Sequence, residues 1–280
     1  MGYRHLDCAQ IYSNEAYIGK SIAKVIEEGT VKREDLWITA KVYNHMHEKV
    51  EEACKQSIAD LQCDYIDLYM VHWPFPNYHP PNCSIDYRGP DAKPFNIDTF
   101  MKTWAQMEAL VEKGLVKNIA VSNMTISKLQ GVLDNCKIKP VANEIELHPC
   151  FQQQELVDFM KKNEVFPIGY SPIGSPNRPD RDRQPEDACD TEEPVVKQIA
   201  DRLQIHPAVV CLKWAIQRGT APIPMSANPK NLLANLQGVL SEPLTEEEME
   251  LMKGAEKNSR LIKGQVFLWP DAKGWEDLWT

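Results

Sequence analysis

Four side chains within the first 72 residues of the chain have the chemistry to move a proton to or from a carbonyl oxygen. Each follows, directly or within a few residues, an apolar segment typical of a β-strand: Asp7, Tyr12, Lys41 and His72. A tyrosine with its ordinary pKa of about 10 is a poor proton donor at neutral pH. A nearby ammonium lowers that pKa, and a carboxylate behind the ammonium keeps it charged and in place. Because the histidine can orient a carbonyl oxygen, the four residues suit reversible proton transfer while hydride arrives from elsewhere.

Each of these residues also has an ordinary structural explanation. Tyr12 would be half-buried packing, Asp7 and Lys41 a common ion pair, and His72 a satisfied core histidine. For any one of them alone we favour that explanation. Their shared position at the ends of consecutive predicted strands favours the catalytic interpretation, because these ends gather at one face of a parallel barrel.

Composition excludes several classes of function. The net charge of -9 and the lack of a basic block argue against a nucleic-acid partner. No apolar run approaches the roughly 18 residues of a membrane span, and no charged-then-apolar leader opens the chain. The eight cysteines are scattered without a CxxC pair, and several lie in apolar segments. We therefore expect a reduced, cytoplasmic protein without a metal site, present as a monomer or weak dimer.

Strand-like and helix-like segments alternate throughout the chain, which predicts an α/β fold with a parallel sheet, since each parallel crossover needs a helix. Asp98 is the predicted N-cap of a helix that stops at Gly114. Predicted strands end near Asp7, Ala40, His72, Ser122, Glu144, Ser171 and Met225. Further helices are predicted over residues 15–28, 47–61, 153–162, 193–203, 207–217 and 229–240.

Polar residues at nearly every strand end favour a closed (β/α)8 TIM-type barrel over an open doubly wound sheet. No Gly-x-Gly-x-x-Gly follows any strand, which agrees with this choice. Only seven βα units can be read where such a barrel needs eight, and the missing unit is most simply the first. We predict one domain over residues 1–280, with residues 258–280 as a tail across the active-site mouth. The long connections 74–97 and 174–190 follow strand ends and should overhang the same face.

Five segments carry a resemblance to a known family. In order and spacing they are similar to the aldo-keto reductase family, and most similar to its aldose reductase and xylose reductase branch. The segments are residues 2–9, 38–41, 68–74, 114–123 and 142–149, within a match from Gly2 to about Gly238. The resemblance implies an NAD(P)(H)-dependent oxidoreductase. It also implies roles for the four residues: Tyr12 is the general acid, Lys41 and Asp7 tune it, and His72 orients the substrate.

The same resemblance implies contacts to the nicotinamide half of the cofactor. Ser122 and Asn123 match the pair that holds the carboxamide, and Tyr170 matches the ring that stacks on the nicotinamide. Glu144 stands where the family usually has Gln. A carboxylate can accept from the amide NH2 but, unless protonated, cannot donate to its carbonyl.

The loop after Tyr170 has the composition of a pyrophosphate contact. Its residues Ser171, Ile173 and Ser175 lie in a Ser-Pro-x-Gly-Ser-Pro stretch, whose backbone N–H groups suit phosphate oxygens. The alternative is a strand that simply runs into a turn.

The site expected to hold the 2'-phosphate departs from the family pattern. NADPH-using relatives have Lys at Met225 and Arg at Asn231, and they have Asp at Asn177. In those relatives the lysine pairs across the cofactor with the aspartate, so loss of one of the two would leave the other charge unpaired. Their joint loss therefore indicates a changed site. The groups left for phosphate are Ser226, Asn228 and Lys230. We expect weaker NADP preference, tolerance of NAD, or faster cofactor release.

The absent first unit affects the substrate pocket. In the family it supplies a Gly-Thr-Trp loop beside the nicotinamide, and without it the second and eighth strands expose unpaired edges. Ile11, Tyr43 and Trp73 remain to line the pocket with the aromatic tail. An incomplete gene model and a genuine seven-unit protein are both open.

Three functions are compatible with these patterns. The first is a reductase of small aldehydes, aldoses or ketones, which retention of the four catalytic-type residues favours. The second is a catalytically silent barrel that binds a cofactor or partner, favoured by Met225, Asn177, Glu144 and the absent first unit. The third is a structural protein recruited from an enzyme.

Overall fold

The computed structural model describes residues 1–176 and 178–280, apart from the side chain of Arg181. Asn177, expected at the cofactor clasp, therefore lies outside the described residues. The chain divides into two compact units. The larger unit comprises Tyr3–Asn143 and Gly264–Thr280, and the smaller unit comprises Met1–Gly2 and Glu144–Lys263. The prediction of a single domain over the whole chain stays a prediction.

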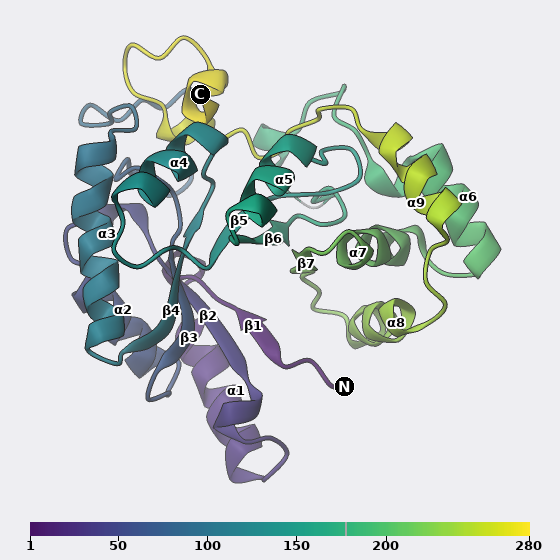
Figure 1. Ribbon diagram of the computed structural model, residues 1–280, viewed down its shortest axis with the longest axis horizontal. Helices are drawn as coiled ribbons and strands as arrows, with labels where there is room; N and C mark the ends of the chain where they lie inside the picture. The colour runs from purple at the N-terminus through teal and green to yellow at the C-terminus, as the bar shows by residue number, and fades with distance from the viewer. Residues whose placement is uncertain (177) are drawn as a thin grey trace. The chain divides into compact units, whose positions relative to one another are not determined.

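The larger unit contains four parallel strands in chain order, with helices between them (Figure 1). The strands are β1 (His5–Asp7), β2 (Trp37–Val42), β3 (Ile66–Val71) and β4 (Val116–Ser122). The helices are α1 (Glu15–Glu27), α2 (Val50–Asp60), α3 (Ile97–Glu112) and α4 (Ile126–Asn135). All six residues of β3 are buried, as expected of a parallel strand covered on both faces. Because β2 runs two residues past its predicted end, Lys41 lies inside it.

Helix α3 shows how sequence sets an element and where the prediction failed. Phe100, Trp104 and Met107 recur at helical spacing and are buried. The N-cap is Asn96, whose side chain accepts a hydrogen bond from the Thr99 N–H at 2.9 Å. The prediction of Asp98 as the cap was wrong. Asp98 lies within the first turn, where a carboxylate still interacts favourably with the helix dipole.

The smaller unit contains the rest of the strands and the cofactor-type loops. Its strands are β5 (Ala142–Glu146), inside which the boundary between the units falls, β6 (Phe166–Tyr170) and β7 (Ala221–Pro222). Its helices are α5 (Gln154–Lys162), α6 (Pro194–Leu203), α7 (Pro207–Gln217), α8 (Pro229–Leu240) and α9 (Glu246–Met252). Val196, Ile199, Val210, Trp214 and Met252 form part of one hydrophobic cluster that joins α6, α7 and α9.

The last strand ends earlier than predicted. Met225 is not a strand end: β7 stops at Pro222, and Met225 is 86% exposed. The final ladder hydrogen bond runs from the Ile223 N–H to the Gly169 carbonyl, at 3.0 Å. Pro224 has no N–H to continue the ladder, so the chain leaves the sheet there.

The C-terminal tail forms short 3-10 turns at Gln265–Phe267 and Trp275–Trp279. Within the larger unit, the ring of Trp73 lies 4.7 Å from that of Phe267 and 5.8 Å from that of Trp279, centre to centre. The tail thus packs on the residue that follows His72. Its placement across an active-site mouth stays a prediction.

The described residues also bear on membrane-spanning helices and on metal sites. Within residues 1–176 and 178–280, every helix is too short or too polar to span a membrane. In the same part of the chain, no group of three or more potential metal ligands lies close together.

Candidate active site

Strand pairing in the larger unit brings Asp7 and Lys41 together. Asp7 is the last residue of β1 and lies opposite Thr39 of β2, so Lys41 is two positions further along β2, on the same face. The Lys41 ammonium forms an ion pair with Asp7 Oδ1, and the lysine side chain is fully buried. A buried ammonium needs such a partner, because burying an isolated charge costs several kcal/mol or more.

Tyr12 and His72 complete the group. Tyr12 closes a 3-10 turn, Gln10–Tyr12, and the Lys41 Nζ lies 5.6 Å from the centre of its ring. The His72 ring lies 6.0 Å from that of Tyr12, centre to centre, at an interplanar angle of 88°. Tyr12 is 49% exposed, so the phenol lies where a substrate can reach it. The four predicted residues therefore gather at the carboxyl ends of β1, β2 and β3.

His72 is uncharged at neutral pH. Burial, and then the charge of Lys41, hold its pKa well below the usual value of 6.5. Its Nδ1 atom is buried and has no hydrogen-bond partner among the described residues. A neutral imidazole carries one N–H donor and one acceptor, so His72 can donate a hydrogen bond without releasing a proton of its own.

Tyr43, predicted to line the pocket, lies beside His72, with the centres of the two rings 5.9 Å apart and an interplanar angle of 71°. Burial raises the pKa of Tyr43 to about 12, aided by Tyr78 and Cys83, so the phenol stays protonated. Its hydroxyl lies 3.3 Å from His79 Nε2. Since His79 Nδ1 faces the Pro80 carbonyl at 3.0 Å, that nitrogen donates and Nε2 accepts from Tyr43. The sequence analysis missed His79, which sits in a long irregular connection without a motif.

The other two predicted pocket residues differ in exposure. Ile11 is 43% exposed and sits beside Tyr12 in the same turn. Trp73 is buried and packs on the aromatic tail, through Phe267 and Trp279. Trp73 is thus held in place by packing, whereas Ile11 is partly open to solvent, and their role as pocket residues stays a prediction.

Ser122 and Asn123, the pair predicted to hold the carboxamide, lie at the end of β4. Asn123 adopts a left-handed conformation (φ 59°), and its Nδ2 donates to the His72 carbonyl at 2.9 Å and to Ser122 Oγ at 3.2 Å. These bonds fix Ser122 and Asn123 next to the catalytic-type residues of the same unit. In β5, Glu144 is buried, with 2% of its surface exposed.

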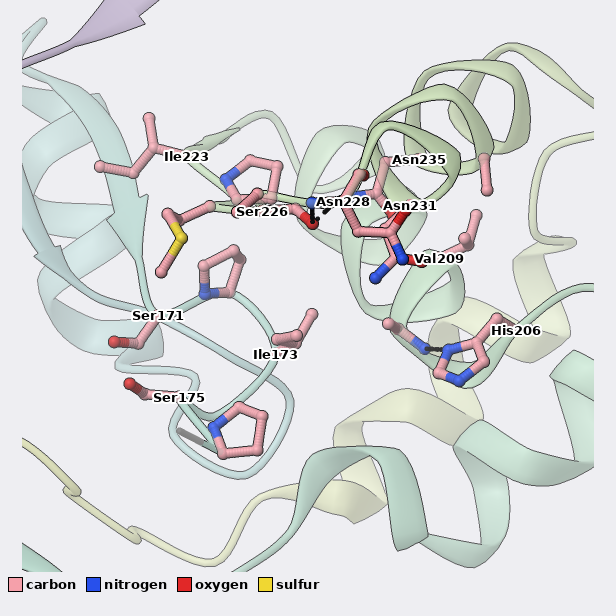
Figure 2. A pocket seen from close by; sticks show the side chains of 17 residues that line it. Ser171, Ile173, Ser175, His206, Val209, Ile223, Ser226, Asn228, Asn231 and Asn235 are labelled. Carbon is pink, nitrogen blue, oxygen red and sulfur yellow. Dashed lines mark hydrogen bonds between the residues drawn. The ribbon is translucent and has the colours of Figure 1, made fainter. Parts of the chain in front are cut away.

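The smaller unit holds a cleft of about 720 Å³ (Figure 2). The loop after β6, the start of α7, the segment after β7 and the start of α8 line it. Tyr170 and Lys230 are not among its described lining residues. Five of the predicted cofactor residues do line it: Ser171, Ile173, Ser175, Ser226 and Asn228.

Further lining residues were not predicted as cofactor contacts. His206 is the N-cap of α7, and its ring nitrogen accepts from the Ala208 N–H at 3.1 Å. The His-Pro pair at residues 206–207 is the sequence signal for this cap, since proline is favoured at the first helical position. Asn231 and Asn235 lie one turn apart on α8 and also face the cleft (Figure 2).

The cleft offers polar groups without formal charge. Its lining residues, as far as the structure describes them, include no Lys, Arg, Asp or Glu. The positive end of the α8 dipole lies at its rim, where Asn228 caps the helix by accepting from the Lys230 N–H at 3.0 Å. Ser171, Gly174 and Ser175 all have positive φ, which bends the loop sharply. Hydroxyls, amides and a helix start suit a phosphate-containing ligand.

Sequence comparison decides the family. The profile described as the Aldo/keto reductase family matches residues 1–257. The chain belongs to the aldo/keto reductase family. An aldo/keto reductase of Synechocystis sp. is 39% identical over 272 residues, which cover 96% of this chain and 82% of that protein. The NADP-dependent D-sorbitol-6-phosphate dehydrogenase of Malus domestica is 38% identical over 264 residues, covering 93% and 84%.

A solved structure agrees with the sequence relatives. The aldose reductase of Schistosoma japonicum superposes with a TM-score of 0.80 at 33% identity, over 95% of this chain and 84% of that one. The predicted (β/α)8-type fold class and the family assignment are therefore confirmed. So is the prediction of an enzyme: this aldo/keto reductase is an oxidoreductase that reduces carbonyl groups with NAD(P)H. A silent or purely structural barrel is not favoured.

Proposed function

We propose that this aldo/keto reductase acts on small aldehydes, aldoses or ketones, with Tyr12 as the proton donor to the carbonyl oxygen. Lys41 and Asp7 make the phenol acidic, and His72 orients the substrate. One observation carries the proposal: a fully buried ammonium, paired with Asp7, lies 5.6 Å from the Tyr12 ring, and His72 meets that ring edge-on.

The residues divide the work of proton transfer. When bound, the nicotinamide dinucleotide supplies hydride to the carbonyl carbon. As negative charge develops on the carbonyl oxygen, Tyr12 gives up its proton, and the Lys41 ammonium stabilises the phenolate that remains. Asp7 keeps the ammonium in place through the ion pair. His72, neutral because it is buried, donates a hydrogen bond to the oxygen and does not compete as an acid.

The hydrogen-bonding groups that line the smaller unit's cleft are of the kinds that bind a dinucleotide. Ser171 and Ser175 offer hydroxyls on the sharply bent loop, Ser226 and Asn228 lie at the start of α8, and Ile173 gives an apolar wall. We assign the phosphates and the adenosine to these residues. We assign the nicotinamide end to Ser122, Asn123, Glu144 and Tyr170.

Cofactor preference should be weak. The apple relative is NADP-dependent by name, but in this chain Met225 and Asn231 place neutral groups at the cleft. Lys230 is exposed at the start of α8, where its ammonium can donate hydrogen bonds to a phosphate. We expect the Kd values for NADPH and NADH to agree within about tenfold, or about 1.4 kcal/mol. A fluorescence titration measures both, and much tighter binding of NADPH would contradict the expectation.

Substitution of the phenol tests the proposed chemistry. In Tyr12→Phe, kcat for aldehyde reduction should fall by about 10²- to 10⁴-fold, because the general acid is lost, while the Kd of the cofactor stays unchanged. Tyr17→Phe is the matched control, since Tyr17 lies on α1 and is 73% exposed. Activity retained in Tyr12→Phe would overturn the assignment. Absence of turnover by the folded wild-type protein would favour the silent barrel.

The cellular setting is part of the proposal. In the described part of the chain no disulfide bond joins two cysteines, which supports a reducing, cytoplasmic compartment. A monomer or weak dimer is proposed, and sedimentation velocity at several protein concentrations tests it.

A further inference from the structure

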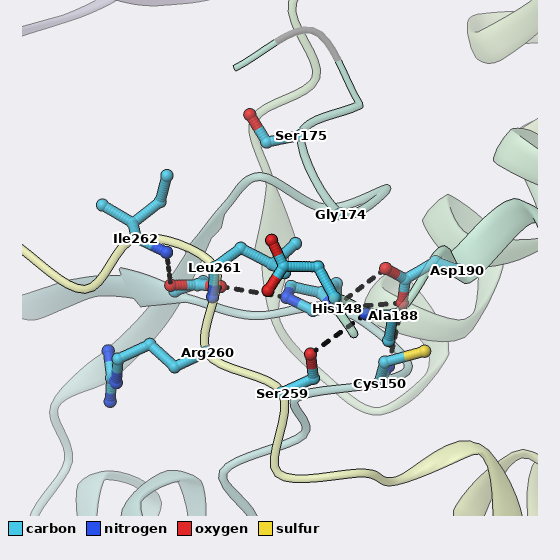
Figure 3. A network of polar contacts seen from close by, with 12 residues as sticks. His148, Cys150, Gly174, Ser175, Ala188, Asp190, Ser259, Arg260, Leu261 and Ile262 are labelled. Atoms are coloured by element: carbon cyan, nitrogen blue, oxygen red, sulfur yellow. Dashed lines mark hydrogen bonds and ion pairs between the residues drawn. The ribbon is translucent and has the colours of Figure 1, made fainter. Parts of the chain in front are cut away.

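A buried cluster of polar groups surrounds His148, just after β5 in the smaller unit (Figure 3). The imidazole is fully buried between two carboxylates. His148 Nε2 lies 3.1 Å from Glu146 Oε1, and Nδ1 lies 3.0 Å from Asp190 Oδ1. An ionised carboxylate can only accept, so both ring nitrogens must carry a proton to make both bonds. The cluster is therefore an imidazolium between two anions.

Each carboxylate also holds backbone that is distant in sequence. Glu146 accepts from the Leu261 N–H at 2.7 Å and from the Ile262 N–H at 2.9 Å. Asp190 accepts from the Cys150 N–H at 2.8 Å. His148 thus joins the end of β5, the connection before α6 and the segment after α9.

The cluster packs closely against Gly174, in the loop that lines the cleft. Gly174 has a positive φ of 74°, and a side-chain carbon added to it would collide with Asp190 Oδ2. The same carbon would also contact Leu261 Cδ1 at 3.6 Å. Gly174 is therefore held between Asp190, which is bonded to His148, and Leu261, whose N–H is bonded to Glu146. Its neighbours in the loop, including Ile173 and Ser175, line the cleft.

A second contact holds the loop carbonyls. The guanidinium of Arg178, whose side chain is 7% exposed, is paired with Asp187. It donates to the Ser175 carbonyl at 3.3 Å and lies 3.5 Å from that of Gly174. The loop is thus fixed by side chains that do not line the cleft.

We propose that His148 is a positioning residue for cofactor binding: with Glu146 and Asp190 it clamps Gly174, and so fixes the 171–176 loop in the shape that receives the dinucleotide. This inference rests on the proposed function of the cleft. His148 does not itself line the cleft, so it acts through Asp190, Leu261 and Gly174.

The clamp has a defined pH range. Burial alone would lower the pKa of His148, but hydrogen bonds to Asp190, Cys150 and Glu146 outweigh it and raise the pKa well above 6.5. The imidazolium therefore persists through neutral pH, and the clamp is lost as pH rises through the raised pKa. The titratable or charged groups around the cluster are Glu146, Asp190, Cys150, Tyr170, Glu193, Cys211, Lys257 and Arg260.

Replacement of the imidazole is the first test. In His148→Gln one carboxylate loses its donor, so the Kd of NADH or NADPH should rise by roughly five- to fifty-fold. At saturating cofactor, kcat should stay within about twofold, because the acid–base residues are untouched. Amide hydrogen exchange in the 171–176 loop of the unliganded protein should accelerate. Wild-type Kd and exchange in this variant would overturn the proposal.

Arg202→Gln controls for simple destabilisation. It breaks ion pairs to Glu242 and Glu248 in the same unit, and none of these three residues is among the described lining of the cleft. At a comparable loss of Tm, this variant should bind cofactor with the wild-type Kd. A rise in Kd as large as that of His148→Gln would reduce His148 to a structural role and overturn the proposal.

A second pair of variants tests the clamp without touching the histidine. Gly174→Ala should displace Asp190 and raise the cofactor Kd, because its new carbon meets the carboxylate and its φ is positive. Gly254→Ala is the matched control, since nothing lies within 4 Å of its added carbon. Equal affinity in both variants would contradict the clamp.

The pH profile needs no structural perturbation. The Kd of wild-type protein should rise at alkaline pH, and His148→Gln should lack that rise. A rise that persists in the variant would assign it to another group and overturn the role of His148. If wild-type protein binds no dinucleotide at all, the proposed function fails, while amide exchange in the unliganded loop still decides the clamp: faster exchange in His148→Gln supports it and unchanged exchange refutes it.

Discussion

The two units treat buried charge in opposite ways. In the larger unit the buried ammonium of Lys41 pairs with Asp7, and the buried histidines His47 and His72 have lowered pKa values. In the smaller unit His148 is buried with a raised pKa between two carboxylates, while the described lining of the cleft has no charged side chain. The ion pair of Lys41 with Asp7 therefore lies among the residues that we propose to react. In the smaller unit the charged cluster around His148 contacts the 171–176 loop, and the polar groups that line the cleft are hydroxyls, amides and an imidazole.

The largest effect should follow from breaking the ion pair of the larger unit. Lys41→Met removes the cation from Asp7, whose side chain is 12% exposed and whose buried Oδ2 atom already has no hydrogen-bond partner among the described residues. We expect a loss of about 3–5 kcal/mol in the free energy of unfolding, measured by urea denaturation, together with loss of turnover.

Two further variants test whether this loss of stability comes from leaving Asp7 without its cation. Lys24→Met, which removes an exposed pair with Glu28, should change stability by no more than about 1 kcal/mol. The double variant Asp7→Asn with Lys41→Met should recover part of the stability but none of the activity, because it removes both charges together. A Lys41→Met protein as stable as Lys24→Met would show that Asp7 is not dependent on its partner.

Sequence could predict the first of these two arrangements better than the second. Asp7, Lys41 and His72 lie at the ends of adjacent parallel strands, where register alone brings side chains together. The pairing of His148 with Asp190 spans 42 residues and joins a strand end to an irregular connection. No periodic pattern in the local sequence therefore indicates it. For the same reason, the sequence predicted only some of the residues that line the cleft.

The errors have local physical causes. Met225 was placed at a strand end because the apolar run continues, but Pro224 ends the ladder first. Asp98 and Asn96 are both good caps, and only the extended backbone at Asn96 identifies the residue that caps α3. His79 carries no motif, and its contact with Tyr43 spans 36 residues.

A smaller effect should distinguish the buried histidines by pH. Burial, and then the charge of His45, lower the pKa of His47 to about 4. Since the unfolded chain binds this proton near pH 6.5, the stability is present above that pH and is lost as pH falls from about 6.5 to 4, by about 3 kcal/mol. Urea denaturation of wild-type protein and His47→Gln across this range measures it. The variant should show a flatter profile, whereas His45→Gln, at an exposed position, should keep most of the slope.

The smallest effect should come from returning charge to the neutral cleft. Met225→Lys places an ammonium at a position that is 86% exposed, so its attraction for a 2'-phosphate is screened by water. We expect NADPH to bind about two- to fivefold more tightly, with NADH unchanged because it lacks that phosphate. The gain should shrink as salt is added, and adding Asn231→Arg should increase it, since a guanidinium can bind phosphate through two hydrogen bonds. Equal tightening of both cofactors in a fluorescence titration would mean that the substitution acts on the shape of the cleft, and that its lack of charge does not set cofactor preference.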